Sequence, residues 1–242
     1  YWTEESYSGL ARRQAAAFGE ARFVFDGTTT LSYAQFAETA LRLAVGLKRR
    51  GVTRGERVAV QLPNWTEFVV ASAALSRIGA VLVPIMPIYR GDEVGYVLGH
   101  AGASAAITCG EFRGFDHLAM FRDLASNAPH LRFLVGARVT DQEDTEDFVS
   151  WDSLLADGEV AELESEAGPD THPDEPFLIV YTSGTTSRPK GCFHTFNTVR
   201  SSAAAIAESL EYSSEDVQFG PSPITHSTGL VTSVLLPMRA SN

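Results

Sequence analysis

An apolar run that leads into a loop of glycine and hydroxyl residues is the feature that most restricts how this chain can fold. Residues Phe177 to Val180 predict a buried strand, and residues 181–191 then read Tyr-Thr-Ser-Gly-Thr-Thr-Ser-Arg-Pro-Lys-Gly. The segment after this loop reads as a helix. A strand, a glycine-containing loop and a helix in this order are typical of phosphate-binding sites in α/β proteins.

The residue types of the loop favour a polyphosphate ligand. Gly184 and Gly191 permit backbone conformations that other residues resist, and they allow a ligand to approach closely. Lys190 adds a positive charge. Four side chains offer hydroxyl groups beside the loop amides: Thr182, Ser183, Thr185 and Thr186. The alternative is a Ser/Thr/Gly surface turn without a ligand.

The loop differs from that of the P-loop nucleoside triphosphatases. Their motif is G-x-x-x-x-G-K-[ST]. Here Pro189 precedes Lys190 and Gly191 follows it, and Pro189 has no amide hydrogen to donate to a phosphate. The sequence therefore disfavours a conventional P-loop ATPase or kinase.

Residues 181–191 resemble the phosphate-binding signature of the adenylate-forming superfamily, which comprises acyl-CoA synthetases, peptide-synthetase adenylation domains and luciferases. That signature is roughly Tyr-Thr-Ser-Gly-Thr-Thr-Gly-x-Pro-Lys-Gly, and the chain departs from it at Ser187. Pro223, His226 and Gly229 are similar to a Pro-x-x-His-x-x-Gly segment of the family. The resemblance covers nearly the whole chain, and its other segments are residues 55–64, 75–87, 89–98 and 101–105.

Helix and strand signals alternate along the chain, which predicts an α/β fold with mostly parallel sheets flanked by helices. Ser32 with Gln35, and Asn64 with Glu67, have the spacing of capping boxes at helix starts, and Asp92 is expected to cap a third helix. The predicted strands are residues 57–62, 80–83, 105–108, 132–135, 177–182 and 217–221. The predicted helices end near residues 51, 78, 100, 125, 210 and 236.

The resemblance implies two subdomains. Residues 1–176 would form the first α/β subdomain, with a solvated acidic connector near residues 139–176. Residues 177–242 would begin the second, which carries the phosphate-binding loop. Family members are typically much longer, and nothing here resembles their later motifs. We therefore expect an N-terminal fragment that lacks the C-terminal half of the family fold.

The resemblance also implies a two-step reaction. A carboxylate attacks the α-phosphate of ATP, which gives an acyl-adenylate and pyrophosphate, and the thiol of coenzyme A then takes the acyl group. The implied enzyme is an acid–thiol ligase that uses ATP, Mg²⁺, coenzyme A and a small carboxylic acid. Two alternatives stay open: an adenylation domain that loads a carrier protein, and a non-catalytic nucleotide-binding fragment.

The same resemblance assigns roles to individual residues. His226 would border the acyl and nucleotide pockets, although a local role as a helix cap is an alternative for it. Thr185 would also be a ligand of Mg²⁺. The implied phosphate-binding residues are Thr182, Ser183, Gly184, Thr185, Thr186, Ser187 and Lys190.

Charge and cysteine usage restrict the partners and the location. With 19 basic and 30 acidic residues the net charge is −11, which argues against nucleic acid and anionic membrane surfaces as partners. The most apolar stretch, residues 69–88, is broken by Arg77 and two prolines, so no membrane span is expected. Cys109 and Cys192 lack metal-ligand spacing and read as reduced thiols of a cytoplasmic protein. A homodimer is left open.

Overall fold

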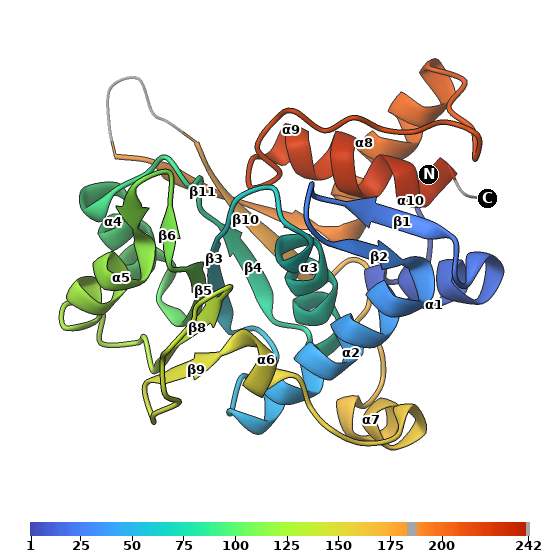
Figure 1. The fold of residues 1–242 in the computed structure, drawn as a ribbon. Helices are drawn as coiled ribbons and strands as arrows, with labels where there is room; N and C mark the ends of the chain where they lie inside the picture. The colour runs from blue at the N-terminus through green and yellow to red at the C-terminus, as the bar shows by residue number, and fades with distance from the viewer. Residues whose placement is uncertain (183–187, 241–242) are drawn as a thin grey trace.

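A seven-stranded sheet forms the centre of the computed structural model, which describes residues 1–182 and 188–240 (Figure 1). In spatial order its strands are β11, β10, β4, β3, β5, β8 and β9. Neighbouring strands run parallel, except for the antiparallel pair β10–β11 at one edge. The bounds are β3 Arg57–Gln61, β4 Val81–Pro84, β5 Ala103–Cys109, β8 Phe133–Ala137, β9 Phe148–Ser150, β10 Pro176–Thr182 and β11 Lys190–Thr195. This arrangement confirms the predicted α/β fold with a mostly parallel sheet.

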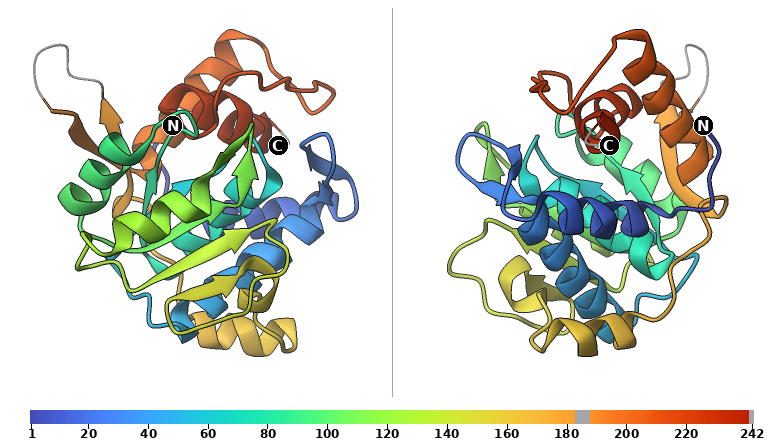
Figure 2. Two further views of the ribbon diagram at one scale, coloured as in Figure 1. Left: turned by 60° about the vertical axis from the view of Figure 1, so that its left-hand side comes forward. Right: turned by 90° about the vertical axis from the view of Figure 1, so that its right-hand side faces the viewer.

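Helices cover both faces of the sheet (Figures 1 and 2). On one face lie α1 Tyr7–Phe18, α2 Tyr33–Arg49, α3 Thr66–Ile78 and α8 Phe196–Ser209, and on the other lie α4 Gly91–Ala101 and α5 His117–Ala125. The chain ends in α9 Ser227–Leu230, the π-helical segment η1 Val231–Leu235 and α10 Leu236–Ala240. The remaining elements are the hairpins β1 Arg22–Phe25 with β2 Thr30–Ser32 and β6 Glu111–Phe112 with β7 Phe115–Asp116, and the short helices α6 Trp151–Leu154 and α7 Val160–Ala167.

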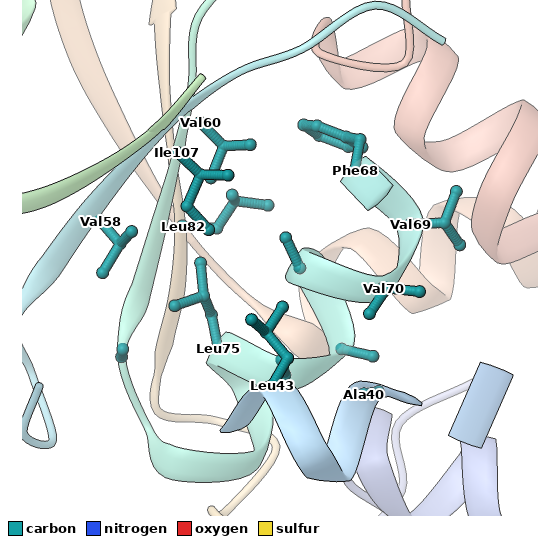
Figure 3. Close-up of a cluster of buried hydrophobic side chains, with 14 of the residues drawn as sticks. Ala40, Leu43, Val58, Val60, Phe68, Val69, Val70, Leu75, Leu82 and Ile107 are labelled. Carbon is teal, nitrogen blue, oxygen red and sulfur yellow. The ribbon is translucent and has the colours of Figure 1, made fainter. Parts of the chain in front are cut away.

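The alternation of side chains along each strand divides the core between the two helical layers. Val58 and Val60 of β3 pack with α2 and α3, whereas Ala59 between them packs with α4 and α5. Figure 3 shows Val60 and neighbouring strand side chains turned toward Leu75 and the rest of α3. Because both faces are covered, the strands at the centre are apolar at nearly every position, as parallel strands usually are.

The predicted helix starts have three different outcomes. The capping box at Ser32 is confirmed, since its Oγ accepts from the Gln35 amide at 3.1 Å and the Gln35 side chain accepts from the Ser32 amide at 2.9 Å. The box predicted at Asn64 is wrong: α3 begins at Thr66, whose amide donates at 3.0 Å to a carboxylate oxygen of Asp26. That acceptor comes from a hairpin forty residues away in the chain, which local spacing cannot indicate.

Helix α4 also begins differently from the prediction. Asp92 lies inside the first turn and Arg90 occupies the N-cap position. The side chain of Glu93 supplies the capping acceptor, and its Oε2 accepts from the Arg90 amide at 3.1 Å. A carboxylate at the third helical position can satisfy an amide at the helix start as well as a residue at the cap can.

The acidic segment, residues 139–176, contains more regular structure than the sequence predicted. It includes β9 and the short helices α6 and α7. Its carboxylates form ion pairs with arginines of the helical layer and its loops: Glu164 with Arg77, Glu166 with Arg49, Asp170 with Arg12 and Glu175 with Arg54. Part of the negative charge of this segment is therefore paired with basic side chains from residues 12–77.

The strand predicted at residues 217–221 is absent. Residues 216–223 contain no helix or strand, and the side chains of Val217 and Phe219 are 88% and 81% exposed. They border a cavity of about 570 Å³, which the β1–β2 hairpin, the start of α3 and η1 also line. The segment has the apolar alternation of a strand but no neighbouring strand among the described residues to pair with.

Two further predictions concern the subdomain boundary and membrane-spanning segments. The predicted subdomain boundary, between residues 176 and 177, falls inside β10, which pairs with β4 in the same sheet as the earlier strands; the division into subdomains stays a prediction. Within the described ranges, 1–182 and 188–240, every helix is too short or too polar to cross a lipid bilayer.

Candidate functional site

The candidate site lies at the loop end of the β10–β11 hairpin. Strand β10 runs between β4 and β11, and residues 177–180 are buried. The helix predicted to end near residue 210 is present as α8, but the sequence did not predict β11, which returns antiparallel to β10 between the loop and this helix. A hydroxyl-rich loop that connects two paired strands brings its own ends together.

Thr182 and Lys190 are the last cross-strand pair of this hairpin. The Thr182 hydroxyl lies 3.5 Å from the carbonyl oxygen of Lys190, and both side chains are exposed. Lys190 has no ion-pair partner among the described residues. The hairpin therefore presents a hydroxyl group and an uncompensated positive charge at the same end.

The remaining predicted residues of the loop fall outside the described part of the chain. They are Ser183, Gly184, Thr185, Thr186 and Ser187. Their roles as phosphate ligands, and that of Thr185 as a ligand of Mg²⁺, stay predictions.

His226 lies immediately before α9 and is exposed. Its Nδ1 accepts a hydrogen bond from the Thr228 amide at 3.3 Å, so it caps the helix start, which is the local role considered for it. It also borders a small cavity together with residues that end β10 and β4. The cavity is lined by Pro84, Ile85, Met86, Tyr89, Val97, Val180, Tyr181, Thr225 and His226. The structure thus brings His226 next to the strand that leads into the predicted phosphate-binding loop.

Asn64 holds the segment that precedes His226, a role that sequence spacing did not reveal. Its Nδ2 donates to the carbonyl oxygens of Gly220 and Ser222 at 3.2 and 2.8 Å, and its Oδ1 accepts from the Ile224 amide at 3.0 Å. We call this set of three hydrogen bonds the Asn64 clasp. A single side chain thereby satisfies three backbone groups in a segment that has no strand partner.

Gly229 fixes the other side of the same segment. A Cβ atom at this position would lie 2.1 Å from the carbonyl oxygen of Pro223, so only glycine allows α9 to pack this closely. The Pro-x-x-His-x-x-Gly spacing therefore has a geometric basis: the glycine of α9 meets the backbone of the proline that opens the motif. His226 lies between these two contact points.

Gln61 and His117 support the wall of the small cavity from behind. Gln61 Nε2 donates to the carbonyl oxygens of Met86 and Tyr89 at 2.9 and 3.2 Å, and its Oε1 lies 3.1 Å from His117 Nδ1. Because the amide oxygen can only accept, His117 Nδ1 must carry the hydrogen. Burial is the main reason that the pKa of His117 is lowered, and the nearby Arg90 adds to the effect. A polar residue within the apolar strand β3 was the available signal for this pair.

The described residues offer no ready-made metal centre. Within residues 1–182 and 188–240, no three side chains of His, Cys, Asp or Glu gather where they could bind a metal ion. Cys109 is buried, burial raises the pKa of its thiol to about 12, and Cys192 is exposed on β11. The chemical groups that the site does offer are a hydroxyl, an ammonium group and an imidazole.

Comparison with known proteins gives a consistent result. The family described as AMP-binding enzyme matches residues 11–241. A medium-chain fatty-acid–CoA ligase of Escherichia coli is 29% identical over 237 residues, which are 98% of this chain and 41% of that protein. A salicyl-AMP ligase / salicyl-S-ArCP synthetase of Mycobacterium tuberculosis is 31% identical over 222 residues, 90% of this chain and 38% of that protein.

A solved structure agrees with these sequence matches. The apo structure of Mycobacterium smegmatis MbtA superimposes with a TM-score of 0.79 and 27% identity, over 98% of this chain and 43% of that one. The chain thus spans about two fifths of the length of the curated relatives it matches.

Proposed function

The chain belongs to the AMP-binding enzyme family, and we propose that it forms the ATP-binding part of an acid–thiol ligase. Its hydroxyl loop and its His226 segment are the parts that resemble the family's motifs. The reaction joins a carboxylic acid to AMP and then transfers the acyl group to coenzyme A. The observation that carries the proposal is the hairpin end, where Thr182 and Lys190 face each other on paired strands.

Electrostatics explain why such a hairpin end suits the first step. The carboxylate and the triphosphate are both anionic, so their approach is opposed by charge repulsion. Lys190 is exposed and free of ion pairs among the described residues, and its ammonium group can therefore neutralise part of the phosphate charge. Groups that are already in position when the reaction occurs lower its barrier without further reorganisation.

We propose that the metal ion is bound mainly by the phosphates of the substrate. Mg²⁺ commonly uses substrate phosphates and water for most of its ligands and one or two protein groups for the rest. When bound, it would draw negative charge from the phosphate oxygens. Thr182 and Lys190 would hold the phosphates themselves, and Thr185 stays our proposed protein ligand of the metal.

His226 is proposed as a wall of the acid pocket. Its imidazole borders the small cavity beside Tyr181, at the end of the strand that leads into the phosphate loop. Its Nδ1 is occupied by the Thr228 amide, which leaves Nε2 as the nitrogen that can meet a substrate. In this proposal Lys190 at the hairpin end meets the phosphates, and His226 meets the carboxylate of the acid.

Pyrophosphate exchange in the intact protein tests the activation step. With a panel of aliphatic and aromatic acids, we expect exchange of labelled pyrophosphate into ATP that depends on the acid. A protein that binds ATP but exchanges no pyrophosphate with any acid of the panel would contradict the proposal and favour a non-catalytic nucleotide-binding role.

The relatives differ in the group that accepts the acyl chain in the second step. One is named a CoA ligase and another a salicyl-S-ArCP synthetase. We propose coenzyme A, and the alternative is a carrier protein. Formation of an acyl thioester on free coenzyme A would support our choice, and thioester formation only on a phosphopantetheine-bearing protein would overturn it.

A further inference from the structure

Helix α4 contacts the phosphate hairpin on both sides of its loop, at β10 and at the residue just before β11. The Tyr96 hydroxyl donates to the carbonyl oxygen of Pro189 at 2.9 Å, just before β11. His100 Nδ1 lies 2.8 Å from the hydroxyl of Tyr181, near the end of β10. Tyr96 and His100 are four residues apart on one helix and therefore share one face.

Ring contacts join the same residues into one cluster. The rings of Tyr96 and His100 are stacked with centroids 5.3 Å apart. The Tyr181 ring meets both edge-on, at 6.3 and 5.7 Å. The guanidinium group of Arg188 lies 5.6 Å from the centre of the Tyr96 ring. Aromatic pairs in this geometry add to the stabilisation that burial alone provides.

Gly191 allows the Tyr181 ring to lie against β11. The two residues are cross-strand partners, and a Cβ atom at Gly191 would lie 3.3 Å from Cζ of Tyr181 and 2.9 Å from Cγ2 of Ile179. The ring therefore occupies the space that a side chain on β11 would need. Burial raises the pKa of Tyr181 to about 12, so at neutral pH its hydroxyl keeps the hydrogen that it can donate to His100.

The helix that carries these contacts is itself firmly held. Val94, Val97 and Leu98 of α4 are at most 2% exposed and pack on the sheet beside α5. Contacts with α4 therefore connect the hairpin to the core of the molecule. The other edge of β11 has no neighbouring strand among the described residues, so α4 restrains a hairpin that the sheet holds from one side only.

We propose that Tyr96 and His100 are positioning residues, which together we call the α4 brace, for the phosphate-binding hairpin. They hold Tyr181 on β10 and Pro189 just before β11, and so they set where the adjacent Thr182 and Lys190 meet the nucleotide. The inference rests on the proposed function, because it concerns the binding of ATP at this hairpin. A group fixed before the substrate arrives binds it at a smaller entropic cost.

Substitutions in the intact protein test the brace. Tyr96→Phe removes the hydroxyl and keeps the ring, and we expect the KM for ATP in pyrophosphate exchange to rise about two- to tenfold, as for one lost hydrogen bond. The KM for the acid should stay unchanged. His100→Leu should act in the same direction, and His100→Asn, which keeps a polar atom near the position of Nδ1, should restore most of the affinity.

Tyr212→Phe is the matched control. It also removes one tyrosine hydroxyl, and that hydroxyl is buried without a hydrogen-bond partner among the described residues. We expect the KM for ATP of this variant to equal that of the wild type. An equal rise in both variants would mean that the Tyr96 effect is a general loss of structure, and it would overturn the brace.

Amide hydrogen exchange provides a readout that needs no activity. Without nucleotide, peptides that cover residues 176–195 should exchange faster in Tyr96→Phe and His100→Leu than in the wild type, while peptides from residues 57–84 should not change. Faster exchange with an unaltered KM for ATP would make the brace purely structural and overturn the proposed role. If the wild type bound ATP but did not exchange pyrophosphate, the proposed activation would fail, and the ATP affinity of Tyr96→Phe would decide the brace separately.

Discussion

Two regions of the molecule, the centre of the sheet and the edge region (β11 and the segment from residue 216 to α9), both contain large apolar side chains, but those of the edge region include several that are exposed. Val58 and Val60 of β3 are fully buried, whereas Phe193 of β11 is 65% exposed and Phe219 is 81% exposed. Strand β3 has a neighbour on each side and helices on both faces. Strand β11 has one neighbour, and residues 216–223 have none among the described residues. The comparison teaches that an apolar pattern becomes a strand only where other strands can satisfy its backbone groups.

Replacing a phenylalanine by alanine in each region should give the largest difference in the free energy of unfolding. Phe68 of α3 is fully buried, and Phe68→Ala should lower the free energy of unfolding by about 3–5 kcal/mol. Phe219→Ala should change it by less than about 0.5 kcal/mol, because that ring is already exposed. Urea denaturation of both variants measures the difference. Similar losses would break the comparison and mean that Phe219 is buried in solution.

Lys190 tests whether the edge region contributes to function more than to stability. Lys190→Ala should lower kcat/KM for ATP in pyrophosphate exchange by about 10- to 150-fold, since a charge-assisted phosphate contact contributes about 1.5–3 kcal/mol. The free energy of unfolding should stay within about 0.5 kcal/mol of the wild type.

The other lysine of the chain is the control for this prediction. Lys48 donates to the carbonyl oxygen of Glu166 at 2.7 Å, in the helical layer. Lys48→Ala should leave the ATP dependence unchanged. If Lys190→Ala behaved in the same way, the phosphate role of the hairpin would be refuted.

Gly229 tests whether α9 packs against the backbone of Pro223 as tightly as side chains pack at the centre of the sheet. Gly229→Ala should destabilise the protein by about 1–3 kcal/mol, because the added methyl group would overlap the carbonyl group of Pro223. Gly99→Ala on α4 is the control: no atom lies within 4 Å of the added Cβ there, and alanine should stabilise the helix by about 0.5–1 kcal/mol. Equal effects in thermal or urea unfolding would show that α9 does not pack against Pro223.

Asp26 tests how far the central region depends on a distant carboxylate. Burial alone would raise the pKa of Asp26, but the backbone amides of Thr29, Thr66 and Thr28 and the guanidinium group of Arg138 donate to it and hold its pKa well below the ordinary value. Asp26→Asn should therefore cost about 1–2 kcal/mol at pH 7.

The sign of the pH dependence follows from that lowered pKa. The ionised carboxylate stabilises the folded state at pH values above the ordinary pKa of aspartate, about 4, and this contribution declines as the pH falls below it. The difference in urea midpoint between wild type and Asp26→Asn should accordingly shrink from pH 7 to pH 3. Asp123→Asn, on the exposed surface of α5, should show almost no difference at any pH. A constant Asp26 effect across this range would contradict the charge-based explanation.

Much of the fold could be predicted because residues close together in the sequence determine those helices and strands. The runs that became β3, β4, β5, β8 and β10 are short, apolar and separated by amphipathic helices. The Ser32 capping box lies within four residues of sequence. The start of α3 could not be predicted in this way, because Asp26 supplies its capping acceptor from another hairpin. Residues 217–221 misled the prediction because alternation describes the strand itself and not the neighbour that it requires.

The candidate site was predictable in composition and less so in geometry. The hydroxyl loop, Lys190 and His226 could be selected from sequence, but the strand β11, which brings Thr182 and Lys190 together in a hairpin, was not predicted. Gln61 and Asn64 could not be assigned their roles, because their partners are backbone groups that carry no side-chain signature. The spacing of Tyr96 and His100 indicates a shared helical face, but not that the hairpin is what they meet.

The Asn64 clasp has a consequence for the order of events during synthesis. The side chain of Asn64 can bond to the Ile224 amide only after some 160 further residues have been synthesised and have left the ribosome. Until then, a polar side chain next to a growing core has only water as a partner. Completion of the His226 segment is therefore a late step in the folding of a nascent chain, whereas β3 and α3 can assemble from neighbouring sequence as it emerges.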